Sequence, residues 1–353
     1  MNTVGFVYSS SKYPEISRSI LQYGTVYQVP IISISIKHLI DHYRGKPLIG
    51  ERWNGTSIEA FNAELPQILD AEYNTFSKKS IKKLDSRFAE WLTEKNIRLI
   101  RQESVSKRHL PQVLMQSELI QYLIPTWDIS SYSQLLQQLV FVKDAVLKPS
   151  NGRMGKGVCK LYKQVNGSVL LRLKDEQMLL NEAIFSDYLA NIRSNCLGDE
   201  LLLQPCLDFS LDADHAVDFR LLRHRGSTGE WEEAATYARI GASSLVSNVS
   251  QGGFIADAKE ILYQIAGDKA EDLYKEIMHI GEELPRMIQK YSDETVFCLG
   301  MDVAVDRQSM RPFILEANTY PGTKYHTHQL AEKRVQYYQY LLKRKKLSPL
   351  TTK

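Results

Sequence analysis

A glycine-rich stretch in the middle of the chain, VLKPSNGRMGKGV (residues 146–158), constrains the possible fold more than any other segment. It carries glycines, lysines and an arginine close together, as phosphate-binding loops do. A Walker loop requires G-x-x-x-x-G-K-[ST], but here Gly155 and Lys156 are followed by Gly157, and Ser150 occupies the position of the first glycine. The G-x-G-x-x-G order of dinucleotide-binding folds is reversed. Neither common nucleotide-binding loop fits this chain.

The segments that flank the glycine loop predict strands and not a helix. The loop is followed by VCKLYKQ, then by Asn166 and Gly167, and then by SVLLRL. Two β-rich runs separated by Asn-Gly are the strongest short-range signal for a β-hairpin. Walker and dinucleotide loops lead from a strand into a helix, whose amino terminus faces the phosphate. The glycine loop of this chain joins strand to strand and therefore belongs to an antiparallel sheet.

The composition excludes several functional classes. The 353 residues include 44 Lys and Arg against 41 Asp and Glu, so there is no overall basic field that would bind nucleic acid non-specifically. The basic runs at residues 78–84 and 341–347 are expected to be solvated helix faces or tails. The amino-terminal apolar run is short and predicts a strand, not a signal peptide or membrane anchor. The widely spaced cysteines predict reduced core residues of a cytosolic protein, without metal or disulfide: Cys159, Cys196, Cys206 and Cys298.

The pattern along the chain predicts mixed α and β structure. Residues 1–105 alternate short β-rich runs with polar helical stretches, which indicates a small α/β unit without a catalytic constellation. Ser106 can cap a helix that Pro125 ends. Further strands are expected at residues 200–207, 216–225, 230–241, 298–306 and 311–318, and helices at 86–96, 134–140, 269–291 and 329–343.

Three oxygen-bearing side chains near the carboxyl end predict a metal site. Asp302 lies on one predicted strand, and Glu316 and Asn318 lie two residues apart on the next, so they share a face. Glu316 follows the apolar run PFIL with no neighbouring cation, and a carboxylate in such a place needs a metal or a basic partner. Mg²⁺ suits carboxylates combined with phosphate oxygens. Asp302 taken alone is equally consistent with a strand-end or turn aspartate.

Taken together, the motifs resemble those of the ATP-grasp superfamily over residues 107–322. No single motif is specific, but seven occur in the family's order: a lysine that opens a helix, LKPSNGRMGKG, LLLQPCL, DFRLL, ARIG, SNVSQGG and MD…LEAN…PG. Within the superfamily the chain looks most like the spore coat-associated YheC/YheD group. It shares a leading region without a recognisable active site and a segment that opens with GxW, GEWEEAATYARIGASSLVSNVSQGG. Ribosomal-protein glutamate ligases and related amino-acid ligases are more distant.

The resemblance implies a fold and a division into domains. The expected fold combines α/β and α+β parts: an ATP-grasp pair of subdomains with antiparallel sheets, which enclose the nucleotide, preceded by a small α/β domain. The implied boundaries are residues 1–105 for the amino-terminal domain, 106–207 for the subdomain with the glycine-rich loop, 208–345 for the subdomain with the Mg²⁺ site, and 346–353 for a basic and polar tail.

The resemblance also implies roles for individual residues. Two lysines would contact the α and β phosphates, amides of the 150–157 loop would cover the β and γ phosphates, and the main chain of residues 203–206 would read adenine, with Asp208 on the ribose. The family usually has Asp before the first lysine, whereas this chain has Ser106, so Lys107 also fits a solvent-facing helix start. The implied ATP-binding residues are Lys107, Lys148, Ser150, Gly152, Gly155, Lys156, Gly157, Gln204, Pro205, Cys206 and Asp208.

The remaining implied residues act on the transferred group and its acceptor. Arg220, Arg239 and Lys148 would be the catalytic residues, the two arginines gripping the phosphoryl group, although an arginine in a strand is also commonly an ion-pair partner, here of Asp218. The acceptor side would be shaped by Asn248 with Gly252 and Gly253, and the mouth lined by Tyr320, Lys324, Tyr325, His326 and His328. A zinc site at the two histidines is disfavoured, because no carboxylate accompanies them.

The chemistry that the resemblance implies is ATP- and Mg²⁺-dependent ligation. A carboxylate would form an acylphosphate, which an amine or thiol then captures, without a covalent enzyme nucleophile. Two alternatives stay open: a structural spore coat protein that binds ATP without turnover, and a kinase that passes phosphate to a hydroxyl. The expected partners are these small substrates and other spore coat proteins, without nucleic acid or membrane, in the cytoplasm or after deposition in the spore coat.

Overall fold

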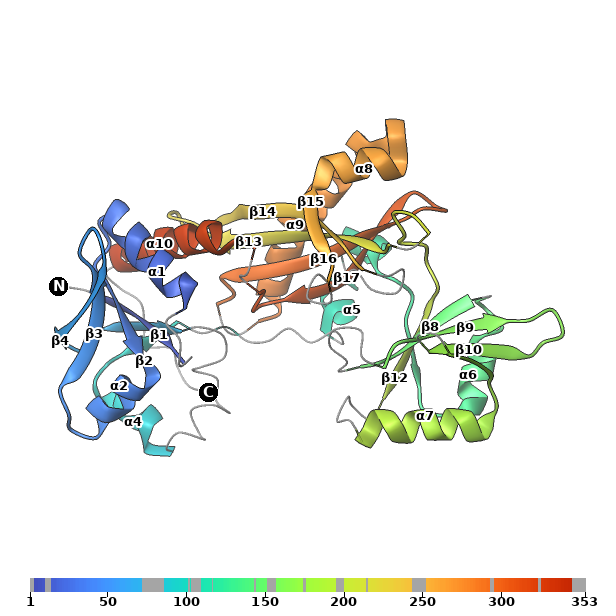
Figure 1. The fold of residues 1–353 in the computed structure, drawn as a ribbon, viewed down its shortest axis with the longest axis horizontal. Helices are drawn as coiled ribbons and strands as arrows, with labels where there is room; N and C mark the ends of the chain where they lie inside the picture. Colours follow the sequence, from blue (N-terminus) through green and yellow to red (C-terminus); the bar gives the residue numbers. More distant parts are fainter. Residues whose placement is uncertain are drawn as a thin grey trace.

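The computed structural model contains three β-sheets, which Figure 1 shows as three units, with the sheet nearest the carboxyl end of the chain lying between the other two. The structure describes residues 3–9, 14–71, 86–100, 102, 109–115, 117–142, 144–150, 157–173, 176–194, 200–213, 215–242, 252–292, 295–322 and 325–344. The predicted residues Lys107, Gly152, Gly155, Lys156, Asn248 and Lys324 lie outside these ranges.

The first sheet has the strand order β4-β3-β2-β1-β5-β6. Strand β1 runs parallel to β2 and β5, and all five of its residues, VGFVY, are buried, as expected for a strand of a parallel sheet covered on both faces. The hairpin of β3 and β4 extends this sheet and was not predicted. The strands are β1 (Val4–Tyr8), β2 (Ile31–Ser35), β3 (Leu48–Trp53), β4 (Ile58–Ala63), β5 (Ile68–Ala71) and β6 (Arg98–Leu99), and the helices are α1 (Glu15–Val26), α2 (Ile36–Tyr43) and α4 (Ser86–Glu94).

The second sheet has the order β11-β10-β9-β8-β12-β7 and its own hydrophobic core. The predicted hairpin is present, and the amide of Gln164 donates to the carbonyl of Ser168 at 2.8 Å. The loop therefore has three residues, with Gly167 at a φ of +84°. The elements are β7 (Trp127–Ile129), β8 (Asp144–Pro149), β9 (Cys159–Lys163), β10 (Val169–Leu173), β11 (Glu176–Leu179), β12 (Leu201–Pro205), α6 (Tyr132–Gln138) and α7 (Glu182–Ser194).

The third sheet is antiparallel and has the order β15-β14-β13-β16-β17. Its strands are β13 (Val217–Arg225), β14 (Trp231–Ile240), β15 (Phe254–Asp257), β16 (Cys298–Asp306) and β17 (Arg311–Asn318). Helices α8 (Ala258–Ala266) and α9 (Ala270–Lys290) pack on one face, together with α5 (His109–Leu114) and the 3-10 helix η1 (Glu118–Tyr122). Residues 109–122 thus share the core of the third sheet, although they precede the second sheet in sequence. The short 3-10 helix η3 (Gly267–Lys269) joins α8 to α9.

The opposite face of the third sheet is divided between core and polar residues. Helix α10 (Thr327–Lys343) packs against one half of this face and against α1, so that a single hydrophobic cluster joins the first unit to the third. Leu222 and Tyr237 belong to this cluster. Arg220 lies two residues before Leu222 on β13, and Arg239 lies two residues after Tyr237 on β14. Both arginines are therefore on the same face of the sheet but outside the cluster. One face of one sheet thus carries both a domain contact and a row of charges.

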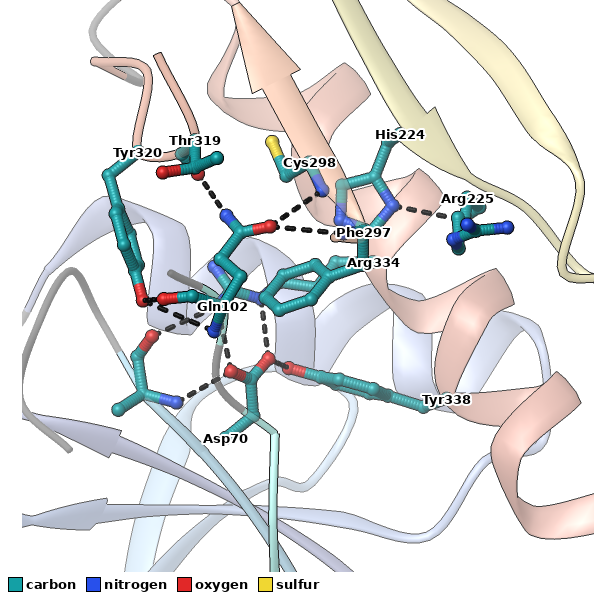
Figure 2. A network of polar contacts seen from close by, with 11 residues as sticks. Asp70, Gln102, His224, Arg225, Phe297, Cys298, Thr319, Tyr320, Arg334 and Tyr338 are labelled. Carbon is teal, nitrogen blue, oxygen red and sulfur yellow. Dashed lines mark hydrogen bonds and ion pairs between the residues drawn. The ribbon is translucent and has the colours of Figure 1, made fainter. Parts of the chain in front are cut away.

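A buried ion pair fastens α10 to the first sheet (Figure 2). Arg334 donates through Nε to Asp70 Oδ2 at 2.6 Å and through Nη2 to Oδ1 at 2.9 Å, and Tyr338 donates to the same carboxylate. Burial by itself would lower the pKa of Arg334, but Asp70 raises it above its ordinary value. The guanidinium also lies 5.0 Å from the ring centroid of Phe6. Charge and packing therefore hold the same contact together.

His224 lies in the same domain contact and is fully enclosed. Its Nδ1 is 2.8 Å from the carbonyl oxygen of Arg225, which can only accept, so Nδ1 carries the proton and Nε2 is left as an acceptor. No protein group of the described structure pairs with Nε2. Burial lowers the pKa of His224 to about 3, so the imidazole is neutral.

Three of the four cysteines lie in the described part of the chain. Cys159, Cys206 and Cys298 are free thiols; the first and last are buried and Cys206 is half-buried. Burial raises the pKa of Cys159 and of Cys298 to about 12, so neither thiol is ionised at neutral pH. Cys196 lies outside the described residues. Among the helices of the described residues, none has the length and apolar character needed to span a bilayer.

The buried ion pair should dominate the stability of the domain contact. Asp70→Asn leaves the charge of Arg334, whose side chain is only 15% exposed, without its carboxylate and should lower the free energy of unfolding by about 3 to 5 kcal/mol. Urea unfolding followed by circular dichroism measures the loss. As a control, Glu59→Gln breaks the exposed pair with Arg52 and should change stability little. Equal losses of unfolding free energy in the two variants would show that the buried pair contributes no more to stability than an exposed one.

The neutral state of His224 should make stability depend on pH. In the unfolded chain the imidazole takes up a proton below its ordinary pKa of 6.5, whereas the folded chain excludes that proton down to about pH 3. The stability that depends on neutral His224 is therefore complete above pH 6.5 and falls between these values. In His224→Asn, the loss of unfolding free energy between pH 7 and pH 5 should be smaller by about 2 kcal/mol. His279→Asn, on a side chain 43% exposed, serves as the control and should keep the wild-type pH profile.

Candidate functional site

Two arginines and two aspartates form a paired row on the open half of the third sheet. Strand register places Arg220 opposite Asp302, and Asp218 opposite Arg239. Arg239 donates to both oxygens of Asp218, at 2.6 and 2.7 Å, and its Nη2 lies 2.7 Å from Asp302 Oδ2. Arg220 donates to both oxygens of Asp302, through Nη2 at 3.0 Å and through Nε. Asp302 is thus held by both guanidiniums.

A β-bulge brings Glu316 beside this row. Asp302 pairs with Glu316, but the next residue, Val303, pairs with Ile314, so β17 has one extra residue at this point. Ile314 and Ala317 both face the core under the sheet, although they are three positions apart. The bulge therefore reverses the alternation and turns Glu316 toward the polar face. Asn318, two residues on, shares that face.

Burial and neighbouring charges have opposite effects on the pKa values of this row. Burial would raise the pKa of Asp302, but the guanidiniums of Arg220 and Arg239 lower it below its ordinary value. Burial would likewise lower the pKa of Arg239, and the carboxylates of Asp218 and Asp302 raise it. Asp302, Arg220 and Arg239 are therefore charged at neutral pH. Tyr237 lies next to them, and burial raises its pKa.

The donor set of the row fits a hard divalent cation. Glu316 accepts a hydrogen bond from Asn318 Nδ2 at 2.7 Å through Oε1, so two members of the predicted trio already touch. The described residues contain no cluster of three or more His, Cys, Asp or Glu placed to hold a metal. Two carboxylates and an amide oxygen nevertheless match Mg²⁺, which takes few protein ligands and completes its shell with phosphate oxygens. Counting Glu316, carboxylates outnumber guanidiniums by one, so a cation is also favoured electrostatically.

The two ends of the glycine-rich loop are anchored in the second unit. Lys148 lies on β8, paired in register with Leu202 of β12, and is partly exposed. At the next turn the amide of Ser150, a buried residue, donates to the carbonyl of Glu200 at 3.0 Å. Past the loop, Gly157 has a φ of +73°, and its carbonyl accepts a hydrogen bond from the Tyr188 hydroxyl.

The predicted adenine-binding strand is β12, an inner strand of the second sheet between β8 and β7. Pro205 ends this strand, and the Cys206 amide donates to the Asp144 carbonyl at 2.8 Å. Gln204 turns its amide nitrogen to the Thr126 hydroxyl at 2.8 Å. The carboxylate of Asp208 accepts from the amide of Ser210 at 3.1 Å and thereby stabilises a local turn. In this structure both polar side chains predicted to meet the nucleotide contact the protein itself.

The two histidines near the carboxyl end point to different neighbours. His326 stacks on Tyr237 of β14 with ring centroids 4.3 Å apart, whereas His328 Nδ1 lies 3.4 Å from the hydroxyl of Ser19 on α1. The two imidazoles therefore do not converge on one point. Neither ring nitrogen of His326 has a hydrogen-bond partner in the described structure. Gly252 and Gly253 lie just before β15 at the sheet edge, with Gly252 at a φ of +99°.

Three residues around the site were not predicted from the sequence. Tyr237 lies two positions before Arg239 on β14, so strand alternation alone places it on the same face. Tyr188, on α7, contacts the end of the glycine loop, and Gln102 contacts the strands of the row; no motif marks either residue. The suggested pairing of Asp218 with an arginine is present, and its partner is Arg239.

The chain matches a known protein family and a curated relative. A family model described as YheC/D like ATP-grasp matches residues 96–347. The endospore coat-associated protein YheD of Bacillus subtilis (strain 168) is 21% identical over 228 residues, which are 63% of this chain and 49% of that protein. The chain thus spans about half the length of this curated relative.

Solved structures show the same fold at low sequence identity. D-alanyl-alanine synthetase A from Vibrio cholerae O1 biovar eltor str. N16961 has a TM-score of 0.51 and 11% identity, over 97% of this chain and 96% of that chain. Biotin carboxylase from Campylobacter jejuni, in a complex with β-γ-ATP, has a TM-score of 0.50 and 9% identity, over 95% and 71%. These likenesses confirm the predicted ATP-grasp architecture. Because the family model covers most of its length, the chain belongs to the YheC/D-like ATP-grasp family.

Proposed function

We propose that the protein is an ATP- and Mg²⁺-dependent ligase that joins a carboxylate to an amine or a thiol through an acylphosphate. The observation that carries this proposal is the polar row, in which Arg220 and Arg239 are held by aspartates next to Glu316 and Asn318. Permanent positive charge and hard oxygen donors side by side are what phosphoryl transfer requires of a protein. Membership of the ATP-grasp family supports the same reading.

The proposed reaction has two steps. A carboxylate oxygen of the first substrate attacks the γ-phosphorus, the bond between that phosphorus and the β,γ-bridging oxygen breaks, and ADP leaves with the bond's electrons. The nitrogen or sulfur of the second substrate then attacks the acyl carbon, the carbon–oxygen bond to phosphate breaks, and the proton of the nucleophile passes to solvent. The products are the ligated acid, ADP and inorganic phosphate, and no residue of the chain is covalently modified.

The chain's own residues would act by position and charge. Lys107 and Lys148 would bind the α and β phosphates, the loop amides from Ser150 to Gly157 would cover the β and γ phosphates, and Arg220 with Arg239 would neutralise the transferred group. Main-chain groups around Gln204, Pro205 and Cys206 would bind adenine, and Asp208 the ribose. When bound through Asp302, Glu316 and Asn318, Mg²⁺ would supply charge neutralisation at the β and γ phosphates.

The paired state of the arginines indicates how the row would respond to ATP. Phosphate oxygens compete with Asp302 for the same guanidinium hydrogens, and a cation at Asp302 competes with the guanidiniums for the carboxylate. When ATP and the cation bind together, the guanidiniums would pair with phosphate and Asp302 would pair with the cation. No buried charge would then be left without a partner. Arg239 would keep Asp218 as a partner during this exchange, because both oxygens of that carboxylate already accept from its guanidinium.

The relative named endospore coat-associated protein YheD supports a cellular setting for this activity. We extend the proposal to association with the bacterial spore coat, with other coat proteins as partners and synthesis in the cytoplasm. The acceptor and donor substrates would then be components available during spore formation.

The reaction class can be tested by its products. With Mg-ATP, free phosphate should be released only when both a carboxylate substrate and an amine or thiol are present; amino acids and cell-wall precursors are the compounds to screen. Mass spectrometry should detect the joined product in amounts equal to the released phosphate. A phosphorylated hydroxyl compound formed without free phosphate would identify a kinase and overturn the ligase assignment.

The two halves of the site can be separated by their dependence on metal. Lys148→Met removes a charged contact to nucleotide phosphate and should weaken ATP binding by about 1.5 to 3 kcal/mol with or without Mg²⁺. Glu316→Gln keeps the shape but loses the charge. It should leave metal-free binding intact or slightly improved, because a repulsion from the phosphates is removed, and should abolish the affinity gained from Mg²⁺.

Isothermal titration with ATP in Mg²⁺ and in chelator provides the comparison for both variants. Lys275→Met, on an exposed lysine of α9 paired with Asp272, is the matched control and should bind like wild type. If Glu316→Gln lost affinity equally in both conditions, the carboxylate would be structural, and the proposed metal site would be wrong.

A further inference from the structure

Gln102 occupies the contact between the first unit and the third sheet (Figure 2). It is buried, with 5% of its surface exposed. Its side-chain oxygen accepts hydrogen bonds from the backbone amides of Phe297 and Cys298, at 3.0 and 3.1 Å. Its side-chain nitrogen donates to the backbone carbonyl of Thr319. One carboxamide therefore bridges two separate segments of the third unit.

The orientation of this carboxamide is fixed by its partners. A backbone N–H can only donate and a backbone carbonyl can only accept, so the oxygen must face Phe297 and Cys298 and the nitrogen must face Thr319. The main chain of Gln102 is held as well, because the Tyr320 hydroxyl donates to its carbonyl at 2.6 Å. The residue is thus immobilised through both its backbone and its side chain.

The bridged segments are the ends of the two strands that carry the predicted metal ligands. Strand β16 begins at Cys298, four residues before Asp302, and Phe297 directly precedes it. Thr319 directly follows Asn318, the last residue of β17. The strand pairing ends at Gly300 opposite Asn318. Beyond that pair, the Gln102 carboxamide takes the place of a peptide group of a neighbouring strand. Its oxygen accepts from the amides of Phe297 and Cys298, and its nitrogen donates to the carbonyl of Thr319.

This bridge matters because the ladder is interrupted on the other side of the site. The β-bulge follows the pair of Asp302 and Glu316 directly, so on that side the register shifts by one residue. Between the bulge and the end of the pairing, only the stretch from Asp302 to Gly300 joins the strands regularly. The short regular pairing of β16 with β17 thus has the bulge at one end and the hydrogen bonds of Gln102 at the other.

We propose that Gln102 is a positioning residue that fixes the spacing between Asp302 on one strand and Glu316 and Asn318 on the other. The proposal rests on the proposed function, because it assumes that these three residues bind Mg²⁺ with ATP. Gln102 touches none of the three side chains in the described contacts and acts through the strand ends. Replacing residues that orient metal ligands without binding the metal commonly lowers metal affinity by about 10-fold to 100-fold.

The test compares the gain in ATP affinity that Mg²⁺ provides in each variant. Gln102→Met keeps the length of the side chain and removes both hydrogen-bonding groups, so the ratio of the Kd in chelator to the Kd in Mg²⁺ should fall about 10-fold, while the Kd in chelator stays unchanged. The matched control is Gln336→Met on α10, which removes a hydrogen bond to Tyr27 in the same domain contact but reaches neither strand end. It should keep the wild-type ratio, even if its melting temperature falls.

The outcomes separate this proposal from the one on which it rests. If wild type gained no affinity from Mg²⁺, the metal site itself would be wrong and the role of Gln102 would fall with it. If wild type showed the gain and folded Gln102→Met kept it in full, only the positioning role would be overturned. Should Gln102→Met not fold, Gln102→Asn retains a carboxamide that is one methylene too short to bridge both segments, and the same reduced ratio is expected of it.

Discussion

The carboxylate of Asp302 stays ionised inside the protein because two guanidiniums lie against it. An unpaired carboxylate at that depth would be strongly destabilising, and Arg220 and Arg239 lower its pKa instead. The second of these arginines is itself fixed by Asp218. The row crosses three adjacent strands, because β13, which carries Arg220, lies between β14 with Arg239 and β16 with Asp302. The polar row is therefore a structural element of the sheet as well as a candidate site.

The same face of the sheet explains how the first and third units are joined. Beyond the row, the residues on this face become apolar and pack against α10 and α1. The buried pair of Asp70 and Arg334 and the bridge made by Gln102 lie in that contact, close to the strands that carry the row. The second unit, by contrast, has a core of its own. The first unit therefore packs against the same sheet that carries the candidate site.

Most strands and helices were predictable because their patterns are local. The runs at residues 217–225, 298–306 and 311–318 lie between turn signals and fold as strands, and residues 270–290, whose apolar side chains recur with a 3.6-residue period, form a helix. The family resemblance, carried by the order of seven motifs, was confirmed. Local patterns do not show which distant elements share a core. The packing of residues 109–122 under the third sheet and the parallel pairing of the first sheet follow from contacts between segments far apart in sequence.

The candidate site divides in the same way. The sequence by itself predicts that Glu316 and Asn318 share a face of their strand, next to the strand that carries Asp302 and after two strand arginines, because side-chain alternation is a property of each strand. Only the tertiary structure decided that both arginines engage Asp302, that a bulge turns Glu316 toward them, and that Gln102 closes the strand ends. These features depend on strand order, register and the docking of a second unit. They are set by burial and by the pairing of charges across the whole fold, which no short stretch of sequence encodes.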